Sequence, residues 1–294
     1  MYPDSPCGRS GVKAGDLLTR LDGEAIADAK QLRAKLAERV PDQPAVLTLR
    51  RGREEVTLKV QLGRLPEDLP PPDLPPGCAA TPPGKSAGTK VGRIPVKLPE
   101  ARNEAWAYVP ENYDPGCPHG LVVWLHAPGT YDEKAVIARW KPHCERYGLI
   151  VSALKAADAD KWEEYEAPVV LRLIGEITSA YHVDPTRIVL HGREGGGTLA
   201  FFAAFAAPGL VHAVATVDGP MSSQGRENDP AGPLAFYVAR TQQSRLAAQI
   251  EKTISSLRQL KYPVTVKSLG QQPRDLNPEE LAELARWIDM LDRI

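Results

Sequence analysis

The chain has 294 residues, enough for two domains, at least one of which can bury a sizeable hydrophobic core. Hydrophobic residues make up 43% of it and charged residues 25%, which is typical of a folded globular protein, and no apolar run approaches the length of a membrane span. The net charge of −1 gives no electrostatic reason to expect a nucleic acid or an anionic membrane, so neither is predicted as a partner.

Four cysteines are widely spaced and form no C-x-x-C pair, so we expect free thiols and predict neither a metal site nor a cofactor. They are Cys7, Cys78, Cys117 and Cys144. The first residues, MYPDSPCGRSG, have neither the basic segment nor the apolar core of a signal peptide, which predicts a cytoplasmic protein as the sequence stands. A true start upstream of Met1 would instead make an exported or periplasmic protein the expectation.

The segment before the first proline-rich stretch carries the elements of a small mixed domain. A short strand is predicted over Leu17–Leu21 and ends at a tight Asp22-Gly23 turn. Asp28 and Gln31 form a predicted capping box for a helix with apolar residues at four-residue spacing. Two further strands, AVLTLRR and EEVTLKVQL, alternate apolar and polar residues around the Arg51-Gly52 turn.

This order, with GVKAGDLL from Gly11 and Leu21-Asp22-Gly23, resembles the later two-thirds of a bacterial PDZ domain of the HtrA-protease type. The resemblance implies a peptide- or protein-binding module whose ligand adds as a strand beside a helix. It places Ala29, Arg33 and Leu36 on that groove helix. The strand and the carboxylate-binding loop that complete such a groove lie upstream of the resembling region. We therefore expect a fragment of a longer PDZ-bearing protease system, or a partial PDZ domain that another chain completes.

Prolines separate this region from the rest of the chain. Eight of the 28 prolines fall between Pro66 and Pro83, and a Gly-Lys-Ser-Ala-Gly-Thr tract follows. Such a composition favours extended polyproline II conformation and excludes helix and central strand. The predicted organisation is a partial PDZ domain over residues 1–64, a proline-rich linker over 65–90 and a second domain over 91–294.

The second domain alternates strand and helix patterns, which predicts an α/β fold with a mostly parallel sheet flanked by helices. Ala105–Val109 is a predicted antiparallel edge strand, and Asn277 with Glu280 is predicted to cap a helix that starts at Pro278. Buried strands are predicted at Leu121–Leu125, Leu149–Ala153, Ile188–Leu190, Val214–Val217, Leu234–Val238 and Val264–Val266.

From about Val91 to Ile294 the chain resembles α/β-hydrolases of the predicted-esterase or polyhydroxybutyrate-depolymerase-like type. The resemblance rests on AWAYVPENYDPGCPHGLVVWLHAPG and on YHVDPTRI, which leads into the glycine-rich segment IVLHGREGGGTLA. It implies a sharp turn from strand to helix that exposes a nucleophile, usually as G-x-S-x-G. Here Gly192-Arg193-Glu194-Gly195-Gly196 takes that place.

The resemblance also implies a triad of a serine at this turn, an acid after a later strand and a histidine after the last strand. Glu194 stands at the serine position. The segment ARTQQ after the strand Leu234–Val238 contains no carboxylate, and no histidine follows His212 in the sequence. Because the triad cannot be assembled, the sequence predicts a hydrolase fold that acts as a binding or scaffolding unit for a ligand, peptide or partner protein.

The alternative is an active esterase or peptidase with an atypical site. Glu194 could itself be the nucleophile, since carboxylates form covalent intermediates in some enzymes. The missing base argues against it, whereas a carboxylate at a helix N-terminus is stabilised there by a few tenths to about 1 kcal/mol.

The predicted vestigial cleft consists of His126, Arg193, Glu194 and Asp218. We interpret His126 as a structural loop residue, and we expect Asp218 to form an ion pair with Arg193 or Arg240. His191 is expected to bond to neighbouring backbone. No metal site is predicted from these residues, because their spacing matches no metal-binding motif.

Overall fold

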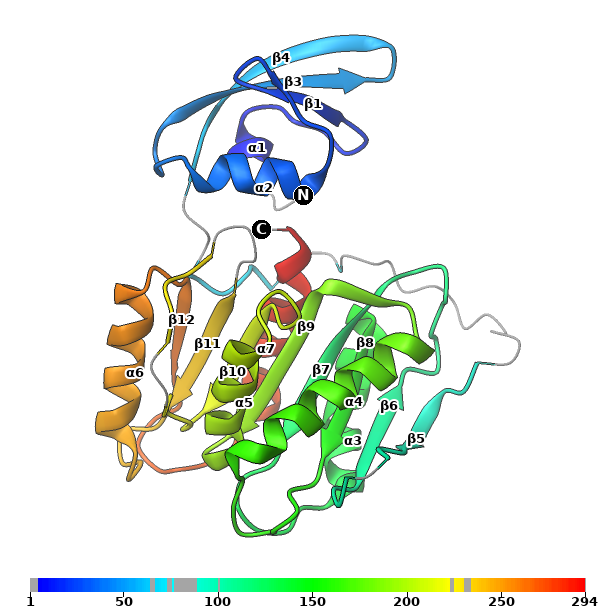
Figure 1. Cartoon of the computed structure of the whole chain (residues 1–294), viewed down its shortest axis with the longest axis vertical. Coiled ribbons are helices and arrows are strands. Elements are labelled where there is room, and N and C mark those ends of the chain that lie inside the picture. The colour runs from blue at the N-terminus through cyan, green and yellow to red at the C-terminus, as the bar shows by residue number, and fades with distance from the viewer. Residues whose placement is uncertain are drawn as a thin grey trace. The chain divides into compact units, whose positions relative to one another are not determined.

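The computed structural model describes residues 5–63, 67–72, 76, 89–99, 101–222, 225–229 and 234–293. The chain groups into two compact units, unit 1 built mainly from the chain up to Pro66 and unit 2 from residues 67–228 and 234–292. Figure 1 labels the elements of both units. The predicted proline-rich linker, residues 65–90, lies largely outside the described residues.

Unit 1 contains a four-stranded antiparallel sheet in the order β2-β1-β3-β4. Its strands are β1 (Leu17–Leu21), β2 (Glu24–Ala25), β3 (Pro44–Arg51) and β4 (Glu54–Gln61), and its helices are α1 (Pro6–Arg9) and α2 (Ala29–Ala37). The bounds of β1 agree with the prediction.

Alternation of apolar and polar residues along these strands gives unit 1 a small core. Its buried side chains are Leu21, Ala45, Leu47, Leu49 and Val60. Helix α2 begins where predicted, because the Asp28 carboxylate accepts a hydrogen bond from the Gln31 N–H at 2.7 Å. The Gln31 side chain, however, accepts from the Ala27 N–H and not from that of Asp28, so the predicted capping box forms only in part.

Unit 2 is built on an eight-stranded sheet in the order β12-β11-β10-β9-β7-β8-β6-β5. The strands are β5 (Gly92–Val96), β6 (Ala105–Val109), β7 (His119–Leu125), β8 (Leu149–Leu154), β9 (Val183–Arg193), β10 (Ala213–Val217), β11 (Ala235–Arg240) and β12 (Val264–Ser268). Strand β6 pairs antiparallel with β5 and β8, and the other pairs are parallel. This mostly parallel sheet confirms the predicted fold class. The prediction that Ala105–Val109 is an edge strand is wrong, because β6 lies between β8 and β5 and the edge strand is β5.

Strand β9 is longer than predicted. It has 11 residues, whereas the apolar pattern predicts only Ile188–Leu190. The extension at its start includes Asp184-Pro185, and a proline argues against an inner strand because it cannot donate a ladder hydrogen bond. The register of β9 against β7 shifts at this point, which accommodates the proline.

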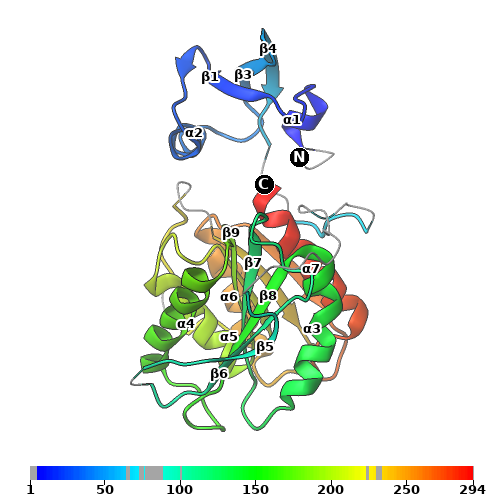
Figure 2. The same cartoon turned by 90° about the vertical axis from the view of Figure 1, so that its right-hand side faces the viewer.

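Helices cover both faces of the sheet in unit 2, as Figure 2 shows for α4 and α5 on one side and α3 and α7 on the other. The helices are α3 (Glu133–Tyr147), α4 (Ala167–Ala180), α5 (Gly195–Ala206), α6 (Ala247–Gln259) and α7 (Pro278–Met290), with short 3-10 turns at Glu164–Glu166 and Leu291–Arg293. The capping box predicted for α7 forms, since Asn277 and Glu280 each accept a hydrogen bond from the other's N–H.

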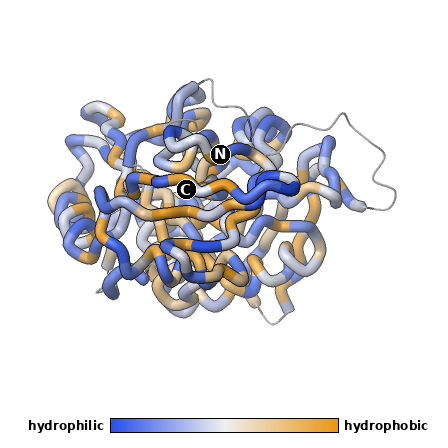
Figure 3. Tube along the Cα trace, turned by 90° about the horizontal axis from the view of Figure 1, so that it is seen from above, coloured by the Kyte–Doolittle hydropathy of each residue, from blue (hydrophilic) through white to orange (hydrophobic). Residues whose placement is uncertain are grey.

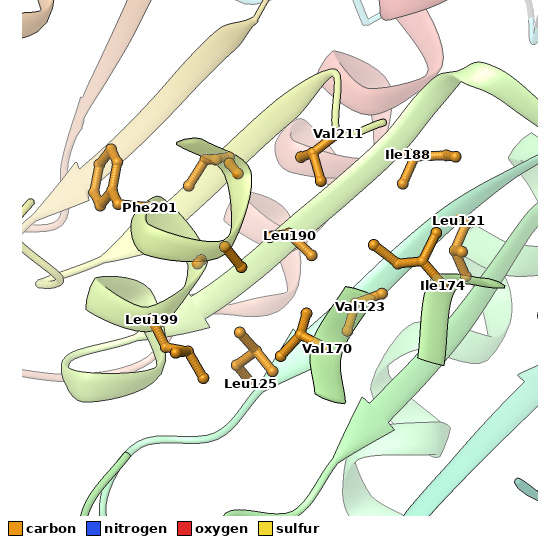
Figure 4. Close-up of a cluster of buried hydrophobic side chains, with 14 of the residues drawn as sticks. Leu121, Val123, Leu125, Val170, Ile174, Ile188, Leu190, Leu199, Phe201 and Val211 are labelled. Atoms are coloured by element: carbon orange, nitrogen blue, oxygen red, sulfur yellow. The ribbon is translucent and has the colours of Figure 1, made fainter. Parts of the chain in front are cut away.

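The main core lies between the sheet and helices α4 and α5. Figure 4 shows Leu121, Val123 and Leu125 of β7 beside Val170 and Ile174 of α4, all of them buried. Along the chain trace, hydrophobic residues recur between hydrophilic ones (Figure 3), the pattern expected of elements with one buried side.

The YHVDPTRI motif forms a buried ion-pair network at the start of the parallel strands. The Arg187 guanidinium, 1% exposed, donates to Asp184 at 3.0 Å and to Asp289 of α7 at 3.2 Å. It also donates to the carbonyls of Tyr147 and Pro118. The motif therefore joins β9 to α7 and to the segments that precede β7 and β8, and its role is structural.

Candidate functional site

The turn between β9 and α5 holds Glu194 in a strained backbone conformation. Its φ is 48° and its ψ is −117°, a combination that side-chain-bearing residues adopt at a cost on the order of 1–3 kcal/mol. Its N–H donates to the Val217 carbonyl at 2.9 Å, and its carbonyl accepts from the Thr198 N–H at 3.0 Å. This strand–turn–helix geometry is that of a nucleophile elbow, with Glu194 at the apex.

Close backbone packing explains two of the glycines in the turn. A Cβ atom on Gly192 would lie 2.4 Å from the carbonyl carbon of Gly196, and one on Gly196 would lie 2.4 Å from the carbonyl oxygen of Leu125. Gly195 differs, because a Cβ there would meet nothing nearer than Trp162 at 3.7 Å. Glycine is therefore required at Gly192 and Gly196 but not at Gly195.

The Glu194 carboxylate pairs with two arginines. Its Oε1 lies 3.3 Å from Nη2 of Arg193, and its Oε2 lies 3.5 Å from Nη2 of Arg245. The Arg245 side chain is 79% exposed. Long, solvent-accessible ion pairs of this kind contribute about 0–1 kcal/mol each, so they bias the position of the carboxylate without locking it.

The loop after β7 faces the start of α5, where a hydrolase binds the oxyanion with the N–H of the residue after the nucleophile and an N–H from this loop. Pro128 of the loop lies near Gly195 and has no N–H. The Gly129 N–H donates to the Ala159 carbonyl at 2.7 Å. Pro128 and Gly129 therefore offer no N–H to an oxyanion. Sequence reasoning missed this feature, although the proline two residues after His126 was visible.

His126 is buried, and both of its ring nitrogens are used. Nδ1 donates to the Ala127 carbonyl at 2.6 Å, and Nε2 accepts from the Ala156 N–H at 3.0 Å. Burial lowers the pKa of His126, which keeps the ring neutral. His126 thus ties the loop after β7 to the segment after β8, a structural role of the kind expected for it.

His191 belongs to the opposite side of the sheet from α5. Its Nδ1 bonds to the Ala215 carbonyl of the neighbouring strand at 3.0 Å, and its ring meets that of Trp140 of α3 at 5.7 Å. Burial lowers the pKa of His191 as well. The expected bond to neighbouring backbone is confirmed, and this histidine does not face the elbow helix.

The ion pair predicted between Asp218 and Arg193 or Arg240 is wrong. The Asp218 carboxylate accepts two hydrogen bonds from Thr241, one from its N–H and one from its hydroxyl. Arg193 pairs with Glu194, and Arg240 pairs with Glu251. The positive φ of Asp218, 50°, places its carboxylate against the end of β11, a backbone feature that the sequence pattern did not reveal.

In a hydrolase of this fold, the catalytic acid and the histidine follow two strands of the sheet. In this chain the corresponding positions carry carboxamide side chains. Gln243 follows β11, and Gln271 and Gln272 follow β12. Gln243 donates to Gln271 at 3.2 Å and accepts from Gln272 at 2.7 Å. Carboxamides do not take up a proton at neutral pH, so this cluster can bind polar groups but cannot act as a general base.

Of the predicted vestigial cleft, the structure brings Arg193 and Glu194 into contact. His126 approaches the elbow through its backbone, since a Cβ on Gly196 would lie 2.6 Å from the His126 carbonyl oxygen, and Gly219, the residue after Asp218, packs on the elbow helix. The side chains of His126 and Asp218 bond to Ala156 and Thr241 instead.

In unit 1 the groove helix α2 presents exposed Ala29 and Arg33, while Leu36 is half-buried. Within residues 5–63 the strands are the four of the sheet order β2-β1-β3-β4, and no further strand completes a peptide groove with α2. The described part of unit 1 therefore supplies one wall of a peptide groove.

In the described ranges, no group of three or more histidine, cysteine, aspartate and glutamate side chains is arranged to hold a metal ion. The same residues include no helix that is long and apolar enough to cross a membrane.

The expectation of free thiols is wrong for one cysteine. Cys117, in the loop between β6 and β7, is disulfide-bonded. Cys7 and Cys144 are free thiols, half-buried and buried respectively. Cys78 lies outside the described residues.

Residues 2–62 match the PDZ domain family. The chain begins with a PDZ domain. Over 65 residues it is 34% identical to a protein named "Probable periplasmic serine endoprotease DegP-like" from Brucella suis, which is 22% of this chain and 13% of that protein. The protein of the same name from Rhizobium meliloti is 35% identical over 68 residues, 23% of this chain and 14% of that protein. The chain thus matches a small part of the length of these relatives.

Unit 2 has the fold of α/β-hydrolase esterases. Est1E from Butyrivibrio proteoclasticus superposes with a TM-score of 0.52 at 12% identity, covering 69% of this chain and 98% of that one. A ferulic acid esterase gives a TM-score of 0.53 at 11% identity, covering 69% and 99%. At such identities the likeness shows the shared fold alone. Residues 2–62 are thus similar to PDZ domains, and unit 2 shares the fold of α/β-hydrolases.

Proposed function

We propose that this chain is a hydrolase-fold protein without hydrolytic activity, which binds a peptide or protein segment through its PDZ domain or through the former substrate side of unit 2. One observation carries the proposal: the apex of the elbow holds the Glu194 carboxylate, paired with Arg193 and Arg245. The two nearby guanidiniums stabilise the carboxylate anion, which lowers its reactivity as a nucleophile.

The missing proton carriers support the same conclusion. Attack of Glu194 on an ester would give an acyl–glutamyl anhydride and a leaving alkoxide that needs a proton. Water must then be activated to open the anhydride. His126 uses both ring nitrogens, His191 faces the other side of the sheet, and Gln271 stands after the last strand. None of these three residues can act as a general base at the elbow.

The PDZ domain supports the binding half of the proposal. PDZ domains bind extended polypeptide by strand addition, and α2 offers exposed Ala29 and Arg33 as one wall of such a groove. The DegP-like relatives are named as periplasmic endoproteases. By analogy we propose a periplasmic location and a role beside proteolysis in which this chain holds a polypeptide without cutting it.

A second candidate function rests on the backbone of Glu194. The strained conformation at the apex, with φ of 48°, is one that proteins retain at catalytic turns. It favours residual esterase activity that uses the Glu194 carboxylate as nucleophile.

A fluorophosphonate probe, which couples covalently to activated serines, tests the proposal against a displaced catalytic serine. We expect no probe on the purified chain under conditions that label a control esterase. Labelling that maps to one serine, and is lost when that serine is replaced by alanine, would overturn the proposal.

The binding half needs its own test. Panning a display library of extended peptides on the chain should enrich sequences that bind the wild type and bind Arg33→Glu more weakly. The matched control is Arg53→Glu, in the turn between β3 and β4. Failure to enrich any peptide, or equal loss in both variants, would contradict binding at α2.

A further inference from the structure

The charged side chains at the apex of the elbow do not balance. Arg193 and Arg245 supply two guanidiniums, and both face the single carboxylate of Glu194. These three residues, called the elbow cluster below, therefore carry one formal positive charge in excess. A monoanion bound beside them would neutralise the cluster.

Two carboxylates on neighbouring elements have partners outside the elbow cluster. Asp218, which follows β10, accepts both of its hydrogen bonds from Thr241. Glu251 of α6 pairs with Arg240. The excess charge on Arg193 and Arg245 is thus available to a ligand.

The two guanidiniums also retain unused hydrogen-bond donors. Each carries several N–H groups in a planar fork, and each approaches Glu194 with Nη2, at 3.3 Å from Arg193 and 3.5 Å from Arg245. Charge-assisted hydrogen bonds are usually about 2.7–2.9 Å long, so Glu194 holds these donors loosely. Among the described residues, the buried Nε of Arg193 has no hydrogen-bond partner. The arginines can therefore accept a second carboxylate.

An apolar surface adjoins the same apex. A Cβ on Gly195 would lie 3.7 Å from the Trp162 ring and 3.8 Å from Pro128. The Trp162 indole is fixed there, since it donates to the His126 carbonyl at 2.8 Å. Trp162 follows β8 and Arg245 follows β11, and these strands lie on opposite sides of β9 (Figure 1). A ligand across the end of β9 would meet guanidiniums on one side and an aromatic ring on the other.

We propose that the elbow cluster binds the carboxylate of an organic ligand, with Arg193 and Arg245 holding the anion and Trp162 packing against an apolar group beside it. This inference rests on the binding role proposed above for the former substrate side of unit 2. A carboxylate suits the single excess charge better than a phosphate group, which carries about −1.5 to −2 at pH 7. Glu194 shares the two guanidiniums with the ligand and so weakens its binding.

Isothermal titration calorimetry of the full chain with hydrocinnamate at low ionic strength tests the site. We expect binding that is weaker for the uncharged hydrocinnamamide. Arg245→Gln should weaken hydrocinnamate binding by about fivefold or more. The matched control is Arg93→Gln, which removes an exposed arginine from a pair with Glu133 on the edge strand β5 and should leave the binding unchanged. No binding, equal binding of acid and amide, or equal affinities of the two variants would overturn the proposal.

Glu194→Gln separates competition from a structural role. The substitution removes the internal carboxylate but keeps the shape of the side chain, so hydrocinnamate should bind about three- to tenfold more tightly. Unchanged or weaker binding would refute the competition with Glu194. Inorganic phosphate should bind more weakly than hydrocinnamate at the same ionic strength, and phosphate binding of equal or greater strength would refute the choice of a carboxylate.

A tetrapeptide that ends in phenylalanine distinguishes two sources of the carboxylate. Tighter binding of the peptide than of hydrocinnamate, lost when its C-terminus is amidated, would assign the site to a polypeptide end, whereas equal or weaker binding would assign it to a small carboxylate. Repeating the titration with Arg33→Glu excludes binding at α2. Ester turnover would refute the absence of hydrolysis without affecting these titrations, so the two proposals can fail separately.

Discussion

Asp218, at the end of β10, accepts two hydrogen bonds from Thr241, at the end of β11: the Thr241 N–H lies 2.8 Å from Oδ1 and its hydroxyl 2.7 Å from Oδ2. Asp218 is 1% exposed. Thr241 follows the strand after which a hydrolase of this fold carries its acid. This buried carboxylate therefore joins the ends of two strands. Its hydrogen bonds go to Thr241, whereas the acid of a catalytic triad orients a histidine.

Replacing Thr241 by valine should destabilise unit 2 by about 1–3 kcal/mol, because one oxygen of the buried carboxylate loses its partner. Thr241→Ser keeps the hydroxyl and should cost less than half as much. All five tryptophans, from Trp106 to Trp287, lie in unit 2, so tryptophan fluorescence during urea unfolding reports this unit. Equal stability of the two variants would show that the hydroxyl bond contributes nothing.

Two neighbouring glycines of the elbow should respond oppositely to alanine. Gly196→Ala places a methyl group 2.4 Å from the Leu125 carbonyl oxygen and should cost several kcal/mol or prevent folding. Gly195→Ala has room and gains up to about 1 kcal/mol of helix propensity. The measurement is the yield of folded protein and its urea midpoint. A stable Gly196→Ala protein would contradict the elbow geometry.

The buried network of Arg187 should dominate the stability of unit 2. Arg187→Met leaves Asp184 and Asp289 without their guanidinium, and removing one partner of a buried pair costs about 3–5 kcal/mol. The control is Lys141→Gln, which breaks an exposed pair with Glu111 and should cost less than about 1 kcal/mol. Similar urea midpoints for both variants would rule out a structural role for the motif.

Acid should weaken the fold partly through His126. Its pKa lies below the ordinary value of 6.5 because burial disfavours the charged ring, and protonation would also remove the acceptor of the Ala156 N–H. As the pH falls below about 6.5, the unfolded chain binds the proton first, so stability falls until the folded pKa is reached.

The measurement is the free energy of unfolding at about pH 7.5 and about pH 5.5 in the wild type and in His126→Gln. The wild type should lose more, by up to about 1.4 kcal/mol per unit of pKa difference. Burial also lowers the pKa values of His119, His143 and His191. These residues are present in both proteins, so their contributions to the pH dependence cancel in the comparison. Equal losses would mean that His126 does not titrate in this way.

Much of the fold could be predicted from the sequence, because hydrophobic periodicity and helix capping depend on residues that are close together in the chain. The bounds of β1 and the capping box at the start of α7 agree with the residues predicted. The length of β9 was underestimated, because the proline in Asp184-Pro185 argues against a strand. The register shift between β9 and β7 accommodates this proline.

Only the outline of the site could be predicted from the sequence. Strand order placed Glu194 at the apex, but the partners of Asp218 depend on a positive φ that no residue pattern encodes. Cys117 is disulfide-bonded, and the spacing of the cysteines, without a C-x-x-C pair, gave no sign of it. Pro128 is evident in the sequence, but the structure is needed to show that this residue without an N–H lies near Gly195.

Hydrolysis of p-nitrophenyl acetate by the wild type, Glu194→Gln and Glu194→Ala tests whether the elbow retains catalytic activity. We expect all three to release nitrophenol at the same rate, no faster than the same protein after heat denaturation. Turnover by the wild type well above that background, abolished in both variants, would show that Glu194 is a working nucleophile and that the elbow has kept its reaction.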